Sequence, residues 1–260
     1  MKACFQVSTD PSNSMKNPAQ DTSGRNATRT TLKDVVNEIK RRGNAEAVVG
    51  MARFGIRTSA AFGVSVPRLR EMSRKIGKDH ELAQRLWETG IHEARILAGM
   101  IDESARVTED QMEEWGTDFD SWDVVDGSCG NLFDKTPFAA GKAHEWSTRR
   151  EEYVKRAGFV LMAELAVHDK NAPDRTFLEF LPLIIKESSD DRNFVKKAVN
   201  WALRQIGKRN MTLNKAAIQA AKTIQTQDSA CAKWIAADAL RELTSPQVQK
   251  RLIATKAFGK

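Results

Sequence analysis

The sequence predicts an all-α protein in which short helices stack in pairs to form a solenoid. Nearly every segment after residue 30 has the apolar spacing of an amphipathic helix, and no segment alternates convincingly as a strand would. The connecting segments are short, and helix pairs recur at roughly 35 to 45 residues, a period typical of helical repeats. The 260 residues, 41% of them hydrophobic, are enough for a substantial core.

The first half of the predicted solenoid begins with a capped helix. Thr31 is a suitable N-cap for a helix whose apolar residues form one stripe, and Gly43 ends that helix. Pro67 and Gly77 delimit another helix, because proline suits the first turn and glycine suits the C-terminal end. Further helices are expected at residues 45–54, 80–88 with Asp79 as N-cap, 91–101, and 109–115 with Thr108 as N-cap.

The second half contains longer predicted helices. Residues 150–167 form a long amphipathic pattern, and Asp174 is expected to cap a helix over 175–187, whose middle Pro182 makes irregular. Further helices are expected at residues 193–208, 213–225 and 230–243. This paired rhythm favours an α-solenoid of HEAT-like repeats, although the repeats share little sequence. Basic residues on its alternate helices would form a concave groove wide enough for a DNA duplex.

The ends of the chain are expected to lie outside the solenoid domain, which is assigned to residues 31–255. Residues 1–30 are rich in Ser, Thr, Asn, Asp and Pro and lack the apolar core of a signal peptide, so they are predicted to be a disordered leader. Residues 256–260 are assigned as a basic tail. No run of about 18 apolar residues occurs, so no membrane span is predicted.

The three cysteines, Cys4, Cys129 and Cys231, are odd in number and widely spaced. Such usage indicates a reducing compartment without a disulfide framework. We therefore expect the protein in the cytoplasm, associated with the nucleoid, or in the nucleus if the source is eukaryotic. We also expect a monomer.

The net charge of +7 is unevenly distributed. From Arg192 to the C-terminus there are 14 basic and three acidic residues, a net +11, so the remainder carries −4. A basic C-terminal third suggests a polyanionic partner, most simply nucleic acid. The alternative, a solvated lysine-rich surface that aids solubility, has about equal weight on charge alone.

The segment "FVKKAVNWALRQIGKRN" supports the nucleic-acid interpretation. Its apolar residues form one buried stripe, and Lys197, Arg204 and Lys208 lie off that stripe with other cations. Trp201 also lies off the stripe, four residues after Lys197 and three before Arg204. A Trp among cations suits stacking or cation–π contact with a ligand, but from this helix alone packing against the neighbouring repeat is the favoured explanation.

Other chemistry has little support in the sequence. There is no CxxC, HExxH, GxGxxG or GxxxxGK[ST] motif, so neither a metal nor a cofactor is expected. Cys129, in "DGSCGN", has no obvious base nearby in sequence and is interpreted as a buried structural cysteine.

The stretch "FDSWDVVD" concentrates acids beside a tryptophan. Asp120 or Ser121 can cap a helix in which Trp122 and Asp126 are four residues apart and share one face. Val125 and Cys129 would then turn toward the core. A flat π-surface beside a carboxylate attracts a planar cation, although a capped structural helix has the same spacing.

Arg156 is unusual because it lies within a strongly apolar helix, in "EYVKRAGFVLMAEL". A buried or groove-facing Arg needs an anion, which could be a carboxylate such as Asp126 or a phosphate. An Arg at the edge of the helix face is the simpler alternative on this segment alone.

Five segments in order resemble the AlkD-like alkylpurine DNA glycosylases, over roughly residues 31–255. These segments are "MARFGIRTSAAFGVSVPRLR", "LWETGIHEAR", "SWDVVD", "YVKRAGFVL" and "FVKKAVNWALR". The resemblance implies a HEAT-like fold that acts on double-stranded DNA containing alkylated bases, without metal or cofactor. It implies that Trp122 and Trp201 border the lesion, that Asp126 is the catalytic carboxylate, and that Arg156 binds the DNA backbone.

The implied reaction follows from charge. A 3-methyladenine or 7-methylguanine is cationic, so its glycosidic bond is weak, and a carboxylate can stabilise the oxocarbenium-like sugar and position a water. The sequence departs from some relatives at Ser121, where they carry a second Trp, and in its Gly-rich "DGSCGNLF". Three hypotheses remain: a glycosylase for cationic alkylpurines, a non-catalytic binder of damaged or branched DNA, and a protein-interaction solenoid.

Overall fold

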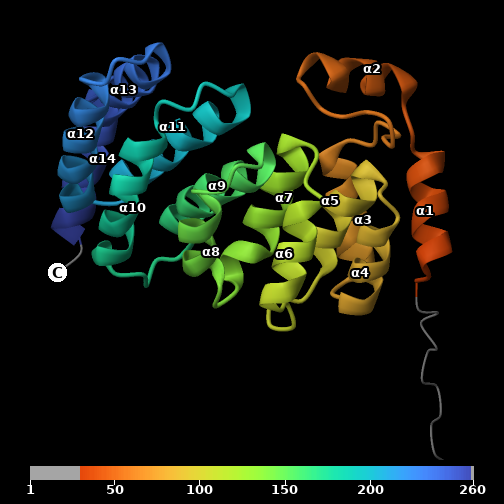
Figure 1. Cartoon of the computed structure of the whole chain (residues 1–260). Coiled ribbons are helices and arrows are strands. Elements are labelled where there is room, and N and C mark those ends of the chain that lie inside the picture. Colours follow the sequence, from red (N-terminus) through yellow and green to blue (C-terminus); the bar gives the residue numbers. More distant parts are fainter. Residues whose placement is uncertain (1–29, 259–260) are drawn as a thin grey trace, which may run out of the picture.

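The computed structural model describes residues 30–258, so nearly all of the predicted leader lies outside the described residues. The described chain is helical throughout (Figure 1), with these elements: α1 Leu32–Arg41, α2 Ala45–Arg53, α3 Val66–Ile76, α4 His80–Glu88, α5 His92–Ile101, α6 Glu109–Thr117, α7 Trp122–Asn131, η1 Phe133–Lys135, α8 Ala139–Trp146, α9 Glu152–His168, α10 Asp174–Glu187, α11 Asn193–Gly207, α12 Met211–Gln225, α13 Ala230–Leu243 and α14 Pro246–Phe258. The described residues contain no strand, as the sequence predicts.

The helices stack as a solenoid. The helices α5, α7, α9, α11 and α13 form one layer in which each packs against the next. The helices α4, α8, α10 and α12 each pack against a helix of that layer, which gives the paired arrangement that the rhythm of the sequence predicts. Figure 1 shows α2 and α11 rising on either side of the ends of α7 and α9, so this side of the solenoid is concave.

Several helices begin where their capping residues predict. Thr31 and Asp34 form a capping box at α1, and the side chains of Asp79 and Thr108 accept the backbone N–H groups of Leu82 and Gln111 at the starts of α4 and α6. Each side-chain oxygen satisfies an N–H that has no partner within its helix.

Aromatic side chains occupy the centre of the core. The rings of Trp87 and Trp115 stack with centroids 3.9 Å apart, and Phe119, Phe133 and Trp146 surround them edge-on or tilted. This cluster fixes α4, α6 and α8 on the outer side of the solenoid, away from α2 and α11.

The structure corrects some predicted boundaries. Asp174 does not cap α10 but is its first residue, because Pro173 takes the N-cap position with an extended backbone and Asp174 accepts a hydrogen bond from Asn210. Pro182 does not interrupt α10, which continues through it with the proline exposed to solvent. The helix α9 begins two residues later than expected and ends one residue later.

Two helices were not predicted. The short α8 follows Pro137, and α14 runs through Phe258, so residues 256–258 belong to a helix. None of the helices in residues 30–258 is long and apolar enough to cross a membrane. Cys129 and Cys231 are buried free thiols, and burial raises the pKa of Cys129 well above its ordinary value, as suits an inert structural cysteine.

Candidate active site

The acidic motif forms the start of α7. Val125 and Cys129 are fully buried, as the predicted helix requires. Ser121 occupies the N-cap position without capping through its side chain, because its hydroxyl donates a 2.6 Å hydrogen bond to Oδ1 of Asp123. That carboxylate oxygen also accepts the N–H of Val124, so the side-chain acceptor at this helix start is Asp123 and neither Asp120 nor Ser121.

Asp126 and Arg156 form a bidentate ion pair between α7 and α9. Nε and Nη2 of Arg156 donate to the two carboxylate oxygens of Asp126 at 2.9 and 2.8 Å, and Nη1 donates to the backbone oxygen of Phe194 at 2.7 Å. Arg156 is buried, while the Asp126 side chain is 24% exposed. Of the two anions expected for Arg156, the structure contains the carboxylate. Burial raises the pKa of Asp126 above its ordinary value, although the guanidinium opposes the rise.

Replacement of Arg156 by Met is expected to lower the free energy of unfolding by about 3 kcal/mol, because it leaves a largely buried carboxylate without its partner. The double variant Asp126→Leu/Arg156→Met is expected to recover most of this loss, since it removes both charges. Urea denaturation gives the free energy of unfolding of the wild type and of both variants. The control Arg175→Met removes an exposed ion pair on α10 and should change stability by only about 0.5 kcal/mol. If Arg156→Met and the double variant lost equal stability, the unpaired Asp126 carboxylate would not be the cause of the loss.

Trp122 lies beside this ion pair. The Cζ atom of Arg156 is 5.8 Å from the centroid of the Trp122 ring, and the indole N–H donates a 3.1 Å hydrogen bond to the backbone oxygen of Phe54. A groove of about 680 Å³ opens beside Trp122 and Asp126. Its other lining residues are Val66, Arg70, Ile96, Met100, Asp123, Gly127, Gly130, Asn131, Lys135, Glu164 and His168.

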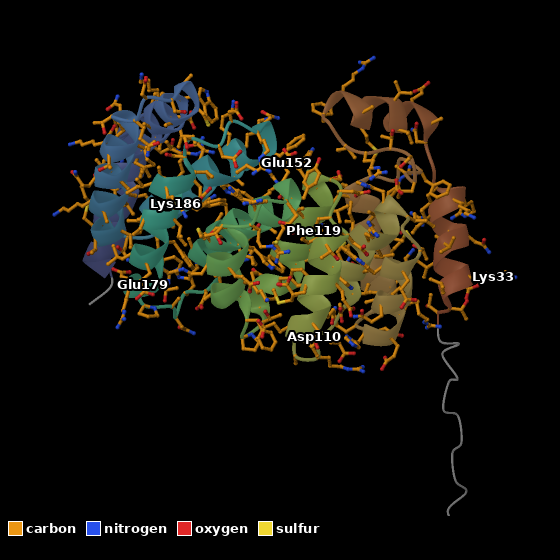
Figure 2. All side chains as sticks on the ribbon, viewed as in Figure 1. Lys33, Asp110, Phe119, Glu152, Glu179 and Lys186 are labelled. Carbon is orange, nitrogen blue, oxygen red and sulfur yellow. The ribbon has the colours of Figure 1, made fainter. Side chains whose placement is uncertain are left out.

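The end of the groove beside Trp122 and Asp126 lies on the concave side. Figure 2 places Glu152, the first residue of α9, near α11 on the side from which α2 extends. Arg156 is four residues further along α9, about one turn, and reaches the first turn of α11 at Phe194. The structure therefore brings three of the predicted site residues together at this position: Trp122, Asp126 and Arg156.

The predicted residues of α11 lie along one face of that helix. Trp201 is seven residues after Phe194, about two turns, and is partly buried against the core. Lys197 is exposed between them. Trp201 thus shares the helix face that reaches Arg156, and part of its surface packs as the simpler interpretation expects.

Two predicted DNA-binding cations are engaged within the protein. Nη1 of Arg204 lies 2.5 Å from Glu242 and 3.6 Å from Asp238, and Nζ of Lys208 lies 2.7 Å from Glu242. Both acids belong to α13, so they offset part of the positive charge counted from the sequence. Two other cations, Arg70 and Lys135, line the groove itself. Arg70 ends the first of the five segments quoted for the resemblance, whereas no quoted segment contains Lys135.

A loop between α2 and α3 is fixed by a buried carboxylate. Glu93, only 1% exposed, accepts the backbone N–H groups of Phe62, Gly63 and Val64 at 2.6 to 3.2 Å. Gly63 has a φ of +79°, a conformation that favours glycine, and a Cβ there would lie 2.2 Å from the Asn44 oxygen. This anchoring holds the loop that supplies the Phe54 oxygen to Trp122.

Asp123 also pairs with a buried histidine. Nε2 of His92 is 2.9 Å from Oδ2 of Asp123. Burial disfavours the imidazolium, but the carboxylate outweighs burial and raises the pKa of His92 above its ordinary 6.5. The pKa of Asp123 falls below its ordinary 3.8 even though burial opposes the change, because His92 and Ser121 stabilise the anion.

This pair is expected to contribute most to stability between about pH 4 and pH 6.5. The His92 contribution is fully present below pH 6.5 and is lost as pH rises through its raised pKa, while the Asp123 contribution is lost as pH falls through its lowered pKa. Urea unfolding of the wild type and His92→Asn should therefore differ more at pH 5.5 than at pH 9. An equal difference at the two pH values would show that the pair does not titrate in this way.

Known proteins resemble this chain in sequence and in fold. The sequence pattern of the family described as DNA alkylation repair enzyme matches residues 35–243. A protein of Listeria innocua serovar 6a, called uncharacterized protein Lin0241, is 25% identical over 167 residues, which are 63% of this chain and 72% of that protein.

A solved structure is similar over 82% of this chain and 96% of its own, with a TM-score of 0.69 and 19% identity. It is described as a new family of proteins related to the HEAT-like repeat DNA glycosylases with affinity for branched DNA structures. That likeness confirms the predicted α-solenoid of HEAT-like repeats. The match over residues 35–243 covers most of the chain, and the chain therefore belongs to the DNA alkylation repair enzyme family.

Proposed function

We propose that this protein is a DNA glycosylase that hydrolyses the N-glycosidic bond of cationic alkylated purines such as 3-methyladenine and 7-methylguanine. The observation that carries the proposal is the placement of the Asp126 carboxylate, partly exposed, beside the Trp122 ring in a groove on the concave side. Membership of a DNA alkylation repair family supports the same reaction class.

Each group has a role that follows from its chemistry. Trp122 offers a π-face and Asp126 a negative charge to a positively charged nucleotide. When the glycosidic bond breaks, the base leaves as a neutral molecule and positive charge develops on the sugar. Asp126 stabilises that charge and orients a water for attack at C1′, so that the products are a free base and an abasic site.

The Arg156 guanidinium has a positioning role in this proposal. Its two hydrogen bonds hold the Asp126 carboxylate toward the groove, and its third anchors the pair to α11 through the Phe194 oxygen. Lys197 and the groove-lining cations Arg70 and Lys135 supply positive charge for the phosphates of the duplex. Trp201, on the same face of α11 as Phe194, would border the lesion from the other side.

A second candidate is a binder of branched or damaged DNA that lacks catalysis. The observation that favours it is that both Asp126 oxygens already accept hydrogen bonds from Arg156, which reduces the negative charge available to a substrate. The similar solved structure, described as having affinity for branched DNA structures, points the same way.

Release of free base from duplex DNA containing 7-methylguanine separates the two candidates. The glycosylase proposal expects base release with accumulation of alkali-labile abasic sites, on a duplex that the protein also binds in a salt-dependent way. Salt-dependent binding without base release from 7-methylguanine or 3-methyladenine DNA would favour the second candidate. Absence of binding to any duplex or branched DNA would contradict both.

A further inference from the structure

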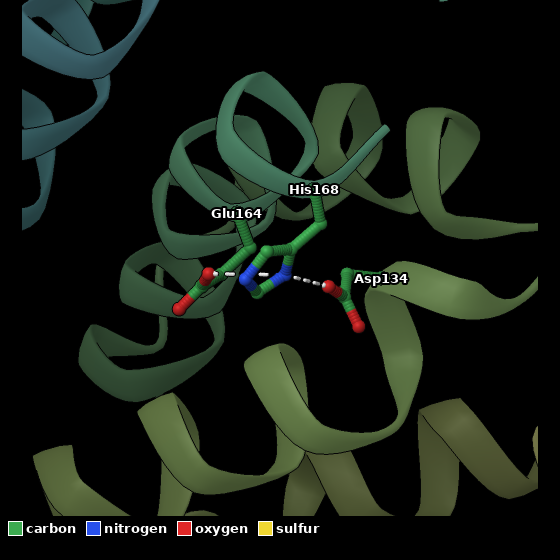
Figure 3. Close-up of side chains that lie close together, drawn as sticks. All are labelled: Asp134, Glu164 and His168. Atoms are coloured by element: carbon green, nitrogen blue, oxygen red, sulfur yellow. Dashed lines mark hydrogen bonds and ion pairs between the residues drawn. The ribbon is translucent and has the colours of Figure 1, made fainter. Parts of the chain in front are cut away.

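A second group of ionisable side chains lies beside the same groove, and two of its members line it. Asp134 of η1 and Glu164 and His168 of α9 converge there, as Figure 3 shows. Nδ1 of His168 is 2.5 Å from Oδ2 of Asp134 and 3.5 Å from Oε2 of Glu164. Glu164 and His168 also line the groove that contains Trp122 and Asp126. The proposed glycosylase reaction uses none of these three residues.

Of the two carboxylates, Glu164 has little positive charge to balance it. The Asp134 side chain is fully buried and pairs with His168 and with Lys135 at 3.0 Å. The Glu164 side chain is 14% exposed, and within residues 30–258 its carboxylate makes no hydrogen bond, only the longer ion pair with His168. Burial raises the pKa of Glu164, and the neighbouring Asp134 and Asp126 raise it further against the effect of His168.

The backbone makes room for the Glu164 carboxylate. A Cβ at residue 130 would lie 2.7 Å from Oε1 of Glu164, so only glycine lets the carboxylate lie directly over α7. Glu164 and His168 are four residues apart on one helix face, which directs both side chains to one point. Asp134 completes a triangle of one nitrogen and two oxygens, all within 4.8 Å of one another.

We propose that Asp134, Glu164 and His168 form a binding site for a divalent transition-metal ion of the zinc type. Zinc binds imidazole nitrogen and carboxylate oxygen at about 2.0 to 2.2 Å, so its ligand atoms are separated by roughly 3 to 3.5 Å. The 2.5 and 3.5 Å separations reach that range with a movement of the half-exposed His168 ring away from Asp134 by less than about 1 Å.

Charge and donor type select the ion. Two carboxylates and a neutral imidazole compensate a 2+ charge, which relieves the repulsion between Asp134 and Glu164. Imidazole favours zinc over magnesium, which prefers an all-oxygen octahedral shell. Lys135, on the second oxygen of Asp134, would orient that ligand. Because Glu164 and His168 line the groove, water from the groove would complete the coordination of the ion.

Calorimetric titration of the 260-residue chain with ZnCl2 in metal-free buffer tests this site without DNA, so its outcome is independent of the proposed glycosylase activity. We expect saturable binding that persists in excess Mg²⁺ and raises the melting temperature. His168→Asn and Glu164→Gln should weaken it at least about tenfold. The controls are His144→Asn, whose ring packs on Phe180, and Glu179→Gln, an exposed carboxylate paired with Arg175.

The control variants also distinguish zinc bound at this site from zinc bound elsewhere on the chain. Binding by the control variants that matches the wild type, together with weak binding by His168→Asn and Glu164→Gln, supports the site. Absence of saturable Zn²⁺ binding by the wild type would overturn it. So would unchanged binding by folded His168→Asn and Glu164→Gln, because the ion would then lie elsewhere. Substitution with Co²⁺ provides a second readout, since its visible absorption should change on binding to wild type and not to His168→Asn.

Discussion

Asp126→Asn is expected to reduce the rate of 7-methylguanine release by at least about 100-fold. The substitution preserves the shape of the side chain but removes the negative charge that the developing oxocarbenium requires. Affinity for the duplex should stay equal or become tighter, because an anion near the phosphates is lost. Single-turnover base release and a binding isotherm, measured on the same substrate, separate the two effects.

The matched control is Asp120→Asn, in the same motif. Its carboxylate lies 3.7 Å from the exposed Arg57 and does not line the groove beside Trp122. This variant should release base at nearly the wild-type rate. Asp126→Asn leaves Arg156 with an incomplete partner, which lowers stability. The melting temperature of this variant must therefore be measured, to show that the protein is folded at the assay temperature. Wild-type release rates by a folded Asp126→Asn protein would remove Asp126 from the catalytic role.

Gly158→Ala is expected to destabilise the fold by about 2 to 4 kcal/mol, and to lower the melting temperature by roughly 5 to 12 °C. A Cβ at residue 158 would lie 2.3 Å from the backbone nitrogen of Ser147 and 2.8 Å from its Cα. These are backbone atoms at the end of α8, so no side-chain rotation relieves the collision. The helices α8 and α9 would have to move apart, and α9 carries Arg156.

Gly141→Ala provides the opposite expectation in a neighbouring helix. Nothing lies within 4 Å of a Cβ built at Gly141, in the first turn of α8. Alanine there should raise stability by up to about 1 kcal/mol, because it restricts the unfolded chain and suits a helix. Thermal unfolding of both variants gives the comparison. Similar small effects at the two positions would mean that α8 and α9 do not pack so closely.

The sequence predicted those parts of the structure that local chemistry controls. The caps at Thr31, Asp79 and Thr108 and the buried face of α7 depend on neighbours within a few residues, and they were confirmed. The helix α8 was missed because it is short, and Asp174 was misplaced because Pro173 is equally suited to precede a first helical residue. In both cases packing decides between alternatives that local preference leaves nearly equal.

The site was only partly predictable for a related reason. The need of Arg156 for an anion followed from its apolar helix, and Asp126 was one of the anions considered. By contrast, the hydrogen-bond acceptors at Phe54 and Phe194 are backbone oxygens, which leave no trace in the residue type. The pairing of Arg204 and Lys208 with acids of α13 depends on how two repeats meet, so a count of charges along the chain could not reveal it.

The loop between α2 and α3, which the Glu93 carboxylate anchors, has a mechanical consequence. In a solenoid each repeat contacts only its neighbours, so small changes between successive repeats add up and alter the curvature of the whole. The loop after α2 departs from this rule because it contacts two helices far along the chain. Its Phe54 oxygen accepts a hydrogen bond from Trp122 of α7, and Gly55 packs so closely on Phe194 of α11 that a Cβ there would lie 2.6 Å from the ring. The loop thus connects the first helices directly to α11. Any change in the curvature of the arc must also displace the indole of Trp122, which couples the width of the groove to the geometry beside Asp126.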